Sequence, residues 1–156
     1  MTEASPARVV ADADVLAADL LVGGFAREAL DHVRRHDWLT LLSSEPLLDE
    51  VEAVVTELGD PDLAAAHRER LGTTTERVEH PEEDHPALAS AYRGGAAHLL
   101  SYDESLRSPE TGLSIQPHAN LSVRPPDAFA RLFDPASLYD VVVGGEYPGP
   151  DRDPRA

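Results

Sequence analysis

The chain has 156 residues, of which 29 are Asp or Glu and 13 are Lys or Arg, and its formal net charge is −16. Its length predicts a single folded domain, and its 42% of hydrophobic residues excludes a wholly disordered chain. It contains no Cys, which excludes disulfide scaffolds, thiolate metal sites and cysteine nucleophiles.

The predicted elements of the first half alternate between short apolar strands and amphipathic helices. In chain order they are a strand at Arg8–Asp12, helices at 13–22 and 25–36, a strand at Trp38–Leu42 and helices at 46–58 and 62–71. Gly23 and Gly24 are expected to break the first helix, and Pro46 suits the first turn of the helix that it begins.

The second half continues the alternation. Its predicted elements are a strand at Thr73–Val78, a loop at Glu79–Asp84, a helix at Pro86–Arg93, a strand at Ala97–Tyr102, a loop to about Asn120, a strand at Leu121–Arg124 and helices at 126–133 and 134–143. We therefore expect a three-layer α/β/α sandwich with a central, mainly parallel sheet over residues 1–143, followed by a mobile tail at 144–156.

The excess of acids predicts adaptation to a salt-rich cytoplasm. All the basic residues are Arg, and the acids are spread along the chain rather than collected in a tail. Like charges repel across about 10 Å at 0.1 M salt and about 3 Å at 1 M salt. An acidic mimic of nucleic acid is the alternative, although the acids form no long run. The net charge therefore does not exclude a nucleic-acid substrate.

The sequence favours a cytoplasmic protein that does not enter a membrane. No apolar run reaches the roughly 20 residues that a spanning helix needs. The first ten residues lack the basic start and apolar stretch of a secretory signal.

Four acids stand out by their positions. Asp12 and Asp103 each follow a predicted strand, and such strand ends lie at the carboxyl edge of a parallel sheet, where ligands bind. Glu50 lies in the first turns of one helix, and Asp84 directly precedes another. All four are expected at one edge, where clustered carboxylates suit Mg²⁺ or Mn²⁺.

Each acid also has a simpler interpretation. With 29 acids in the chain, any one of them is most often a solvated surface residue. Asp84 and Asp14 can serve only as helix caps, and Glu50 can point into water. The hypothesis of a site therefore depends on the joint placement of the acids.

Four segments resemble the PIN-domain nucleases, and together they cover roughly residues 8–133. VVADADVLAADLLVGGFAREAL resembles the opening strand, Asp and helix of that family. SSEPLLDEVEAVV resembles its second acidic segment, and EEDHPALASAYRGGAAHLLSYDESL resembles the segments with its third and fourth acids. SVRPPDAFARLF resembles its closing strand and helix.

The resemblance assigns the family's acids to this chain. They fall on Asp12, Glu50, Asp84 and Asp103, with Glu45, Asp49 and Glu83 as weaker candidates. Ser101 and Asp14 take auxiliary positions at the ends of the two strands. Arg93 and Arg107 are proposed as contacts to the substrate backbone on their proximity in sequence alone.

The resemblance implies a PIN-like ribonuclease that depends on one or two Mg²⁺ or Mn²⁺ ions, either a toxin of a toxin–antitoxin pair or an RNA-processing enzyme. Asp12 and Asp103 would be the central metal ligands, and Glu50 and Asp84 further ligands or positioners of water. RNA is the implied substrate, and a homodimer and an antitoxin protein are implied partners.

Two other functions remain open. ADADVL also resembles the first motif of haloacid-dehalogenase-like phosphatases, but their usual Lys is missing from this chain. The protein can instead be a catalytically inactive PIN-like binding or regulatory module. His32 and His36 lie four residues apart on one helix, where we expect cationic or solvent-facing roles rather than a metal site.

The charge of −16 predicts a fold that depends on salt. We expect a lower melting temperature at low KCl, because self-repulsion is then unscreened. Thermal unfolding at about 0.1 M and about 1 M KCl tests this expectation. A melting temperature indifferent to KCl would remove the argument for adaptation to salt.

Overall fold

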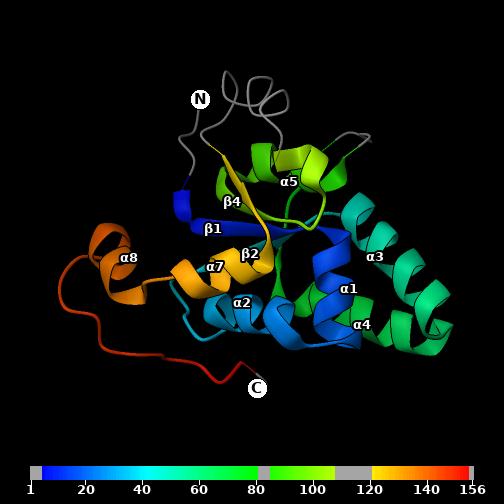
Figure 1. Ribbon diagram of the computed structural model, residues 1–156, viewed down its shortest axis with the longest axis horizontal. Coiled ribbons are helices and arrows are strands. Elements are labelled where there is room, and N and C mark those ends of the chain that lie inside the picture. Colours follow the sequence, from blue (N-terminus) through cyan, green and yellow to red (C-terminus); the bar gives the residue numbers. More distant parts are fainter. Residues whose placement is uncertain (1–4, 81–84, 108–120, 155–156) are drawn as a thin grey trace.

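A parallel sheet of five strands lies at the centre of the computed structural model (Figure 1), which describes residues 5–80, 85–107 and 121–154. The strands are β1 (Ser5–Ala11), β2 (Thr40–Ser43), β3 (Glu76–Arg77), β4 (Ala96–Leu100) and β5 (Ser122–Arg124). Their order is β3-β2-β1-β4-β5, and every pair of neighbours is parallel.

Helices connect these strands and follow the last of them. They are α1 (Ala13–Leu21), α2 (Gly24–Arg34), α3 (Glu45–Leu58), α4 (Pro61–Thr74), α5 (Pro86–Gly94), α7 (Pro126–Leu132) and α8 (Pro135–Val142), with a 3-10 turn η1 at Glu104–Arg107. Among the described residues, no helix is both long and apolar enough to span a bilayer.

The direction of winding separates the helices into two layers. Crossovers between parallel strands are right-handed, so a connection that moves across the sheet in the opposite direction lies on the opposite face. The chain moves one way from β1 to β3 and then returns past β1 to β4. Figure 1 accordingly shows α5 on one side of the sheet and α2 and α7 on the other. The predicted α/β/α sandwich is confirmed.

The central strand explains why both faces need cover. Val9, Val10 and Ala11 of β1 are at most 1% exposed, and the neighbouring strand contributes Leu99 and Leu100, which are fully buried. A continuous apolar run of this kind is typical of a parallel strand with helices on both faces.

The boundary between α4 and β3 differs from the predicted one. Residues 73–78 were expected to form a strand, but α4 continues to Thr74 and β3 is confined to Glu76–Arg77. The hydroxyls of Thr73 and Thr74 both donate to the Arg70 carbonyl at 2.9 Å, which holds these β-branched residues in the last helical turn. Buried Leu71 anchors the same turn in the core.

Hydrogen bonds attach the C-terminal segment to the end of α2. Tyr147 Oη lies 2.6 Å from His36 Nε2, and the Asp151 and Arg152 amides both donate to the Arg35 carbonyl. His36 is only 2% exposed, so the solvent-facing role that was one expectation for this residue is wrong. The prediction of a mobile tail did not foresee these bonds.

Gly94 marks a close approach between α5 and β2. A Cβ at this position would overlap Leu42 Cδ1 and lie 3.0 Å from Val78 Cγ2. Leu42 is 1% exposed, so it has little room to move away. We expect Gly94→Ala to lower the free energy of unfolding by about 1–3 kcal/mol, as overpacking does.

Gly72→Ala is the matched control, because a Cβ there meets only Arg77 Nη2, at 3.4 Å. Gly72 is exposed near the end of α4, where Ala is the better helix former by up to about 1 kcal/mol. Urea denaturation of both variants measures the difference. Equal stabilities would contradict the close approach at Gly94.

Candidate functional site at the carboxyl edge of the sheet

The reversal of the strand order places the carboxyl ends of β1 and β4 side by side. The two strands pair in register from Val9 with His98 to Ala11 with Leu100, and the Asp12 amide donates to the Leu100 carbonyl at 2.8 Å. Ligands of open α/β sheets bind at such a switch point. Asp12 and the residues that follow β4 therefore share one edge, as the sequence predicted.

Ser101 joins the two strand ends. Its hydroxyl donates to Asp12 Oδ2 at 2.8 Å and accepts from the Asp103 amide at 3.0 Å. The residue is fully buried, and its own amide donates to the Arg124 carbonyl of β5. Ser101 was predicted as an auxiliary residue, and the structure places it between Asp12 and Asp103.

Asp12 and Asp103 are held by different local bonds. Asp12 is the N-cap of α1, and its Oδ1 accepts from the Ala13 amide at 2.8 Å. Asp103 Oδ1 accepts from the amide and the hydroxyl of Ser105, at 2.9 and 2.6 Å. Asp12 is half-buried and Asp103 is exposed, so the edge is open to solvent on the side of β4.

Asp14 completes an acidic trio with Asp12 and Asp103. Its Oδ2 accepts from the Tyr102 amide at 3.2 Å, whereas its buried Oδ1 has no hydrogen-bond partner among the described residues. Burial, followed by the charge of Asp12 and with a smaller contribution from Asp103, raises the pKa of Asp14 from 3.8 to about 6. The cap of α1 is Asp12, so Asp14 does not have the simple capping role.

Glu50 faces the same edge from α3. Ser44 caps this helix, and Pro46 lies in its first turn, so the chain leaves β2 directly into α3. Burial and then the charge of Asp12 raise the pKa of Glu50, while His85 lowers it. The carboxylate is nevertheless exposed, and it approaches the trio from outside.

The weaker candidates of the same helix have other partners. Glu45 pairs with Arg68 and Arg77, and Asp49 pairs with Arg68. These exposed ion pairs lie on the side of α3 that faces α4. The geometry therefore favours Glu50 over Glu45 and Asp49 as the acid that belongs to the edge.

Asp84 and Glu83 lie outside the described residues. Within the described residues, no three or more of His, Asp and Glu are close enough together to form a ready metal site. The trio and Glu50 interact through their charges without meeting at one point.

Of the two predicted arginine contacts, Arg93 is not at this edge, and the Arg107 side chain is not described. Arg93 lies in the last turn of α5, and the following Gly95 carbonyl accepts from the Ser5 amide, at the start of β1. Arg93 is therefore at the amino edge of the sheet, a strand length away from Asp12. Arg107 ends η1, and its side chain is outside the description.

Sequence reasoning missed a polar network beside the edge. Ser90 Oγ donates to Ser44 Oγ at 2.8 Å, and His80 Nε2 lies 2.8 Å from the same Ser44 oxygen. Both serines are fully buried. The network joins the N-terminus of α3 to α5, and Ser44 was recognisable only as a residue before a helix.

Comparisons with known proteins identify a family whose function is unknown. The model of a family of unknown function (DUF7384) matches residues 3–155. No curated protein and no solved structure matches the chain.

The raised pKa of Asp14 predicts a stability that depends on pH. A raised pKa means that the fold disfavours the charged form of Asp14. The contribution of protonated Asp14 to the free energy of unfolding is therefore fully present below pH 3.8 and is lost as the pH rises through about 6. We expect Asp14→Asn to raise the melting temperature at pH 7.5 by about 2–4 °C, corresponding to about 1 kcal/mol after solvent screening. At pH 4 the gain should disappear.

Thermal unfolding with EDTA at constant salt measures this difference between the variant and the wild-type chain. Glu57→Gln is the control, because it removes an exposed carboxylate at the far end of α3. A gain for Asp14→Asn that is the same at both pH values would contradict the electrostatic account.

Proposed function

The chain belongs to the DUF7384 family of unknown function, and we propose that it is a PIN-like ribonuclease that uses Mg²⁺ or Mn²⁺ at the carboxyl edge of the sheet. The observation that carries the proposal is the placement of Asp12, Asp14 and Asp103 at two neighbouring strand ends, where the Ser101 hydroxyl bonds to Asp12 and to the Asp103 amide and the Tyr102 amide bonds to Asp14. The four segments that resemble PIN-domain nucleases supply the reaction class.

The donor set fits a divalent cation. Three carboxylates raise the electrostatic energy of the edge, and the buried Oδ1 of Asp14 lacks a hydrogen-bond donor among the described residues. Oxygen ligands of this kind suit Mg²⁺ and Mn²⁺. Asp12 and Asp103 would hold the ion, with Asp14 beside them and Asp84 as the further ligand that the sequence predicts.

The side chains divide the chemical tasks between them. When bound, the ion polarises the phosphoryl group and lowers the pKa of water. Ser101 fixes Asp12 and the Asp103 backbone at one separation. Glu50, whose pKa is raised by burial and by Asp12, would accept a proton from the attacking water.

The cellular setting is part of the same proposal. The net charge of −16 fits a salt-rich cytoplasm, where repulsion between the protein and RNA is screened. The homodimer and the antitoxin remain expectations from the resemblance.

A phosphatase is the second candidate. The pKa of Asp14, near 6, suits the acid–base role that the second Asp has in haloacid-dehalogenase-like enzymes. The absence of Lys from the chain ranks this function below the nuclease.

Diffraction from crystals soaked in Mn²⁺ tests the cation site without a guess about the substrate. We expect an anomalous peak between Asp12 and Asp103. Cleavage of fluorescein-labelled single-stranded RNA by the full chain at molar KCl then tests the activity. Asp12→Asn and Asp103→Asn should each slow cleavage by about 100-fold or more, whereas Glu57→Gln should not.

The outcomes separate the alternatives. Cleavage that resists EDTA, or that survives both Asn substitutions, would contradict the nuclease proposal. Hydrolysis of p-nitrophenyl phosphate without RNA cleavage would favour the phosphatase. A bound ion with neither activity would indicate a binding module on this fold.

A further inference from the structure

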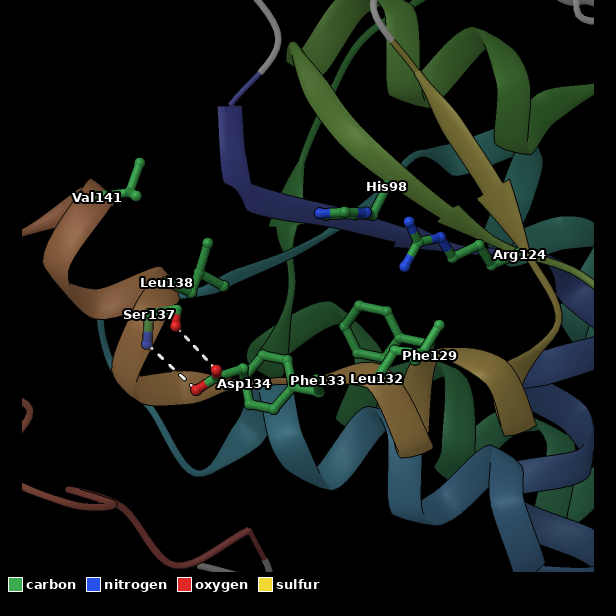
Figure 2. Close-up of a pocket in the computed structure, with 9 residues that line it drawn as sticks. All are labelled: His98, Arg124, Phe129, Leu132, Phe133, Asp134, Ser137, Leu138 and Val141. Atoms are coloured by element: carbon green, nitrogen blue, oxygen red, sulfur yellow. Dashed lines mark hydrogen bonds between the residues drawn. The ribbon is translucent and has the colours of Figure 1, made fainter.

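A pocket of about 280 Å³ opens beside the acidic edge, between β4 and β5 on one side and α7 and α8 on the other (Figure 2). Its walls are mostly apolar, with Phe129 and Leu132 from α7 and Leu138 from α8. His98 of β4 and Arg124 of β5 supply its basic groups, and Asp134, whose carboxylate accepts from Ser137, is its acidic group.

Arg124 places a guanidinium at this pocket. Several arginines pair with carboxylates, as Arg34 does with Asp19 and Arg68 with Glu45, whereas Arg124 does not among the described residues. The Arg124 Nε donates to Ser122 Oγ at 3.1 Å, and in the described part of the chain no carboxylate forms an ion pair with its guanidinium. The residue is half-buried, so this cation lies at the pocket and not in open solvent.

The backbone of β5 connects the pocket to the acidic edge. The Arg124 carbonyl accepts from the Ser101 amide at 3.0 Å, and the Ser101 hydroxyl donates to Asp12. Figure 2 shows the Arg124 guanidinium directed away from that strand end, toward His98 and over Phe129. The backbone of Arg124 therefore lies at the strand ends that carry the acids, while its side chain reaches into the pocket.

We propose that this pocket binds one nucleotide of the single-stranded RNA substrate, with its phosphate on Arg124 and its base in the apolar part between α7 and α8. The proposal rests on the proposed nuclease function, because it names the substrate group that lies next to the reacting phosphate. Arg is suited to phosphate through its planar set of donors, and aromatic rings such as that of Phe129 bind bases by stacking.

His98 adds a polar atom for the base. Its Nδ1 is buried and has no hydrogen-bond partner among the described residues. Its ring packs edge-on against Phe129, with 5.8 Å between the ring centroids. Burial, and then the charge of Arg124, lowers the pKa of His98. The neutral ring can therefore donate or accept a hydrogen bond at the edge of a base without adding charge.

Nucleotide binding tests the pocket independently of cleavage. We expect 5′-UMP or 5′-AMP, added in EDTA to the full chain, to shift the NMR signals of the Leu132 and Leu138 methyl groups. Arg124→Gln should weaken this binding by about 10-fold or more, as the loss of a charged hydrogen bond does. Arg93→Gln is the matched control, because it removes the same charge at the other edge of the sheet.

A second variant keeps the test independent of Arg124. Leu132 is 66% exposed at the wall of the pocket, so Leu132→Glu places a negative charge there without disturbing the core. We expect it to weaken binding of the nucleotides and to weaken binding of uridine and adenosine less. Nucleosides that bind as tightly as the nucleotides would overturn the assignment of phosphate to Arg124.

Different results would contradict the proposed role of the pocket and the proposed nuclease function. RNA cleavage that depends on Asp12 and Asp103 but is unchanged in Arg124→Gln and Leu132→Glu would overturn the pocket alone. Nucleotide binding that needs Arg124, in a chain that cleaves no RNA, would overturn the nuclease and leave the pocket. Chemical-shift changes confined to residues outside the pocket would also overturn it.

Discussion

The repulsion among Asp12, Asp14 and Asp103 is the constraint on which the candidate site depends. The fold cannot relieve it by moving the strands, because the Asp12 amide is bonded to the Leu100 carbonyl and the pairing of β1 with β4 fixes both strand ends. The Ser101 hydroxyl and the Tyr102 amide offset part of the charge. A proton on Asp14 offsets more of it, and under the proposed function a bound cation would do the same, so the geometry that lowers stability would also favour a cation.

The strand ends could be predicted from sequence because their signal is local. Asp12 and Asp103 come within a few residues of short apolar runs, and parallel strands bring such ends to one edge. Ser44 and Pro46 were readable as the start of α3 for the same reason. The boundary of α4 was not readable, since the choice between helix and strand at residues 73–75 depends on back-bonded hydroxyls and on packing of Leu71.

Contacts between distant residues were beyond the sequence. His36 and Tyr147 are far apart in the chain, and only the assembled fold shows that they bond. The network of His80, Ser44 and Ser90 is of the same kind. The placement of Arg93 was a different error, because a helix that precedes a parallel strand ends at the amino edge, away from the acids. The predicted order of helix and parallel strand was enough to place Arg93 at the amino edge.

Under the proposed function, salt would reconcile an acidic protein with an anionic substrate. At molar salt the repulsion between the surface acids and RNA acts over only about 3 Å. Contacts in partly buried places are screened much less, so a phosphate against half-buried Arg124 keeps most of its attraction. The same holds for a cation held between Asp12 and Asp103. High salt would therefore screen the long-range repulsion that opposes binding. The short-range attractions at Arg124 and between Asp12 and Asp103 would persist, so these few contacts would determine where the RNA binds.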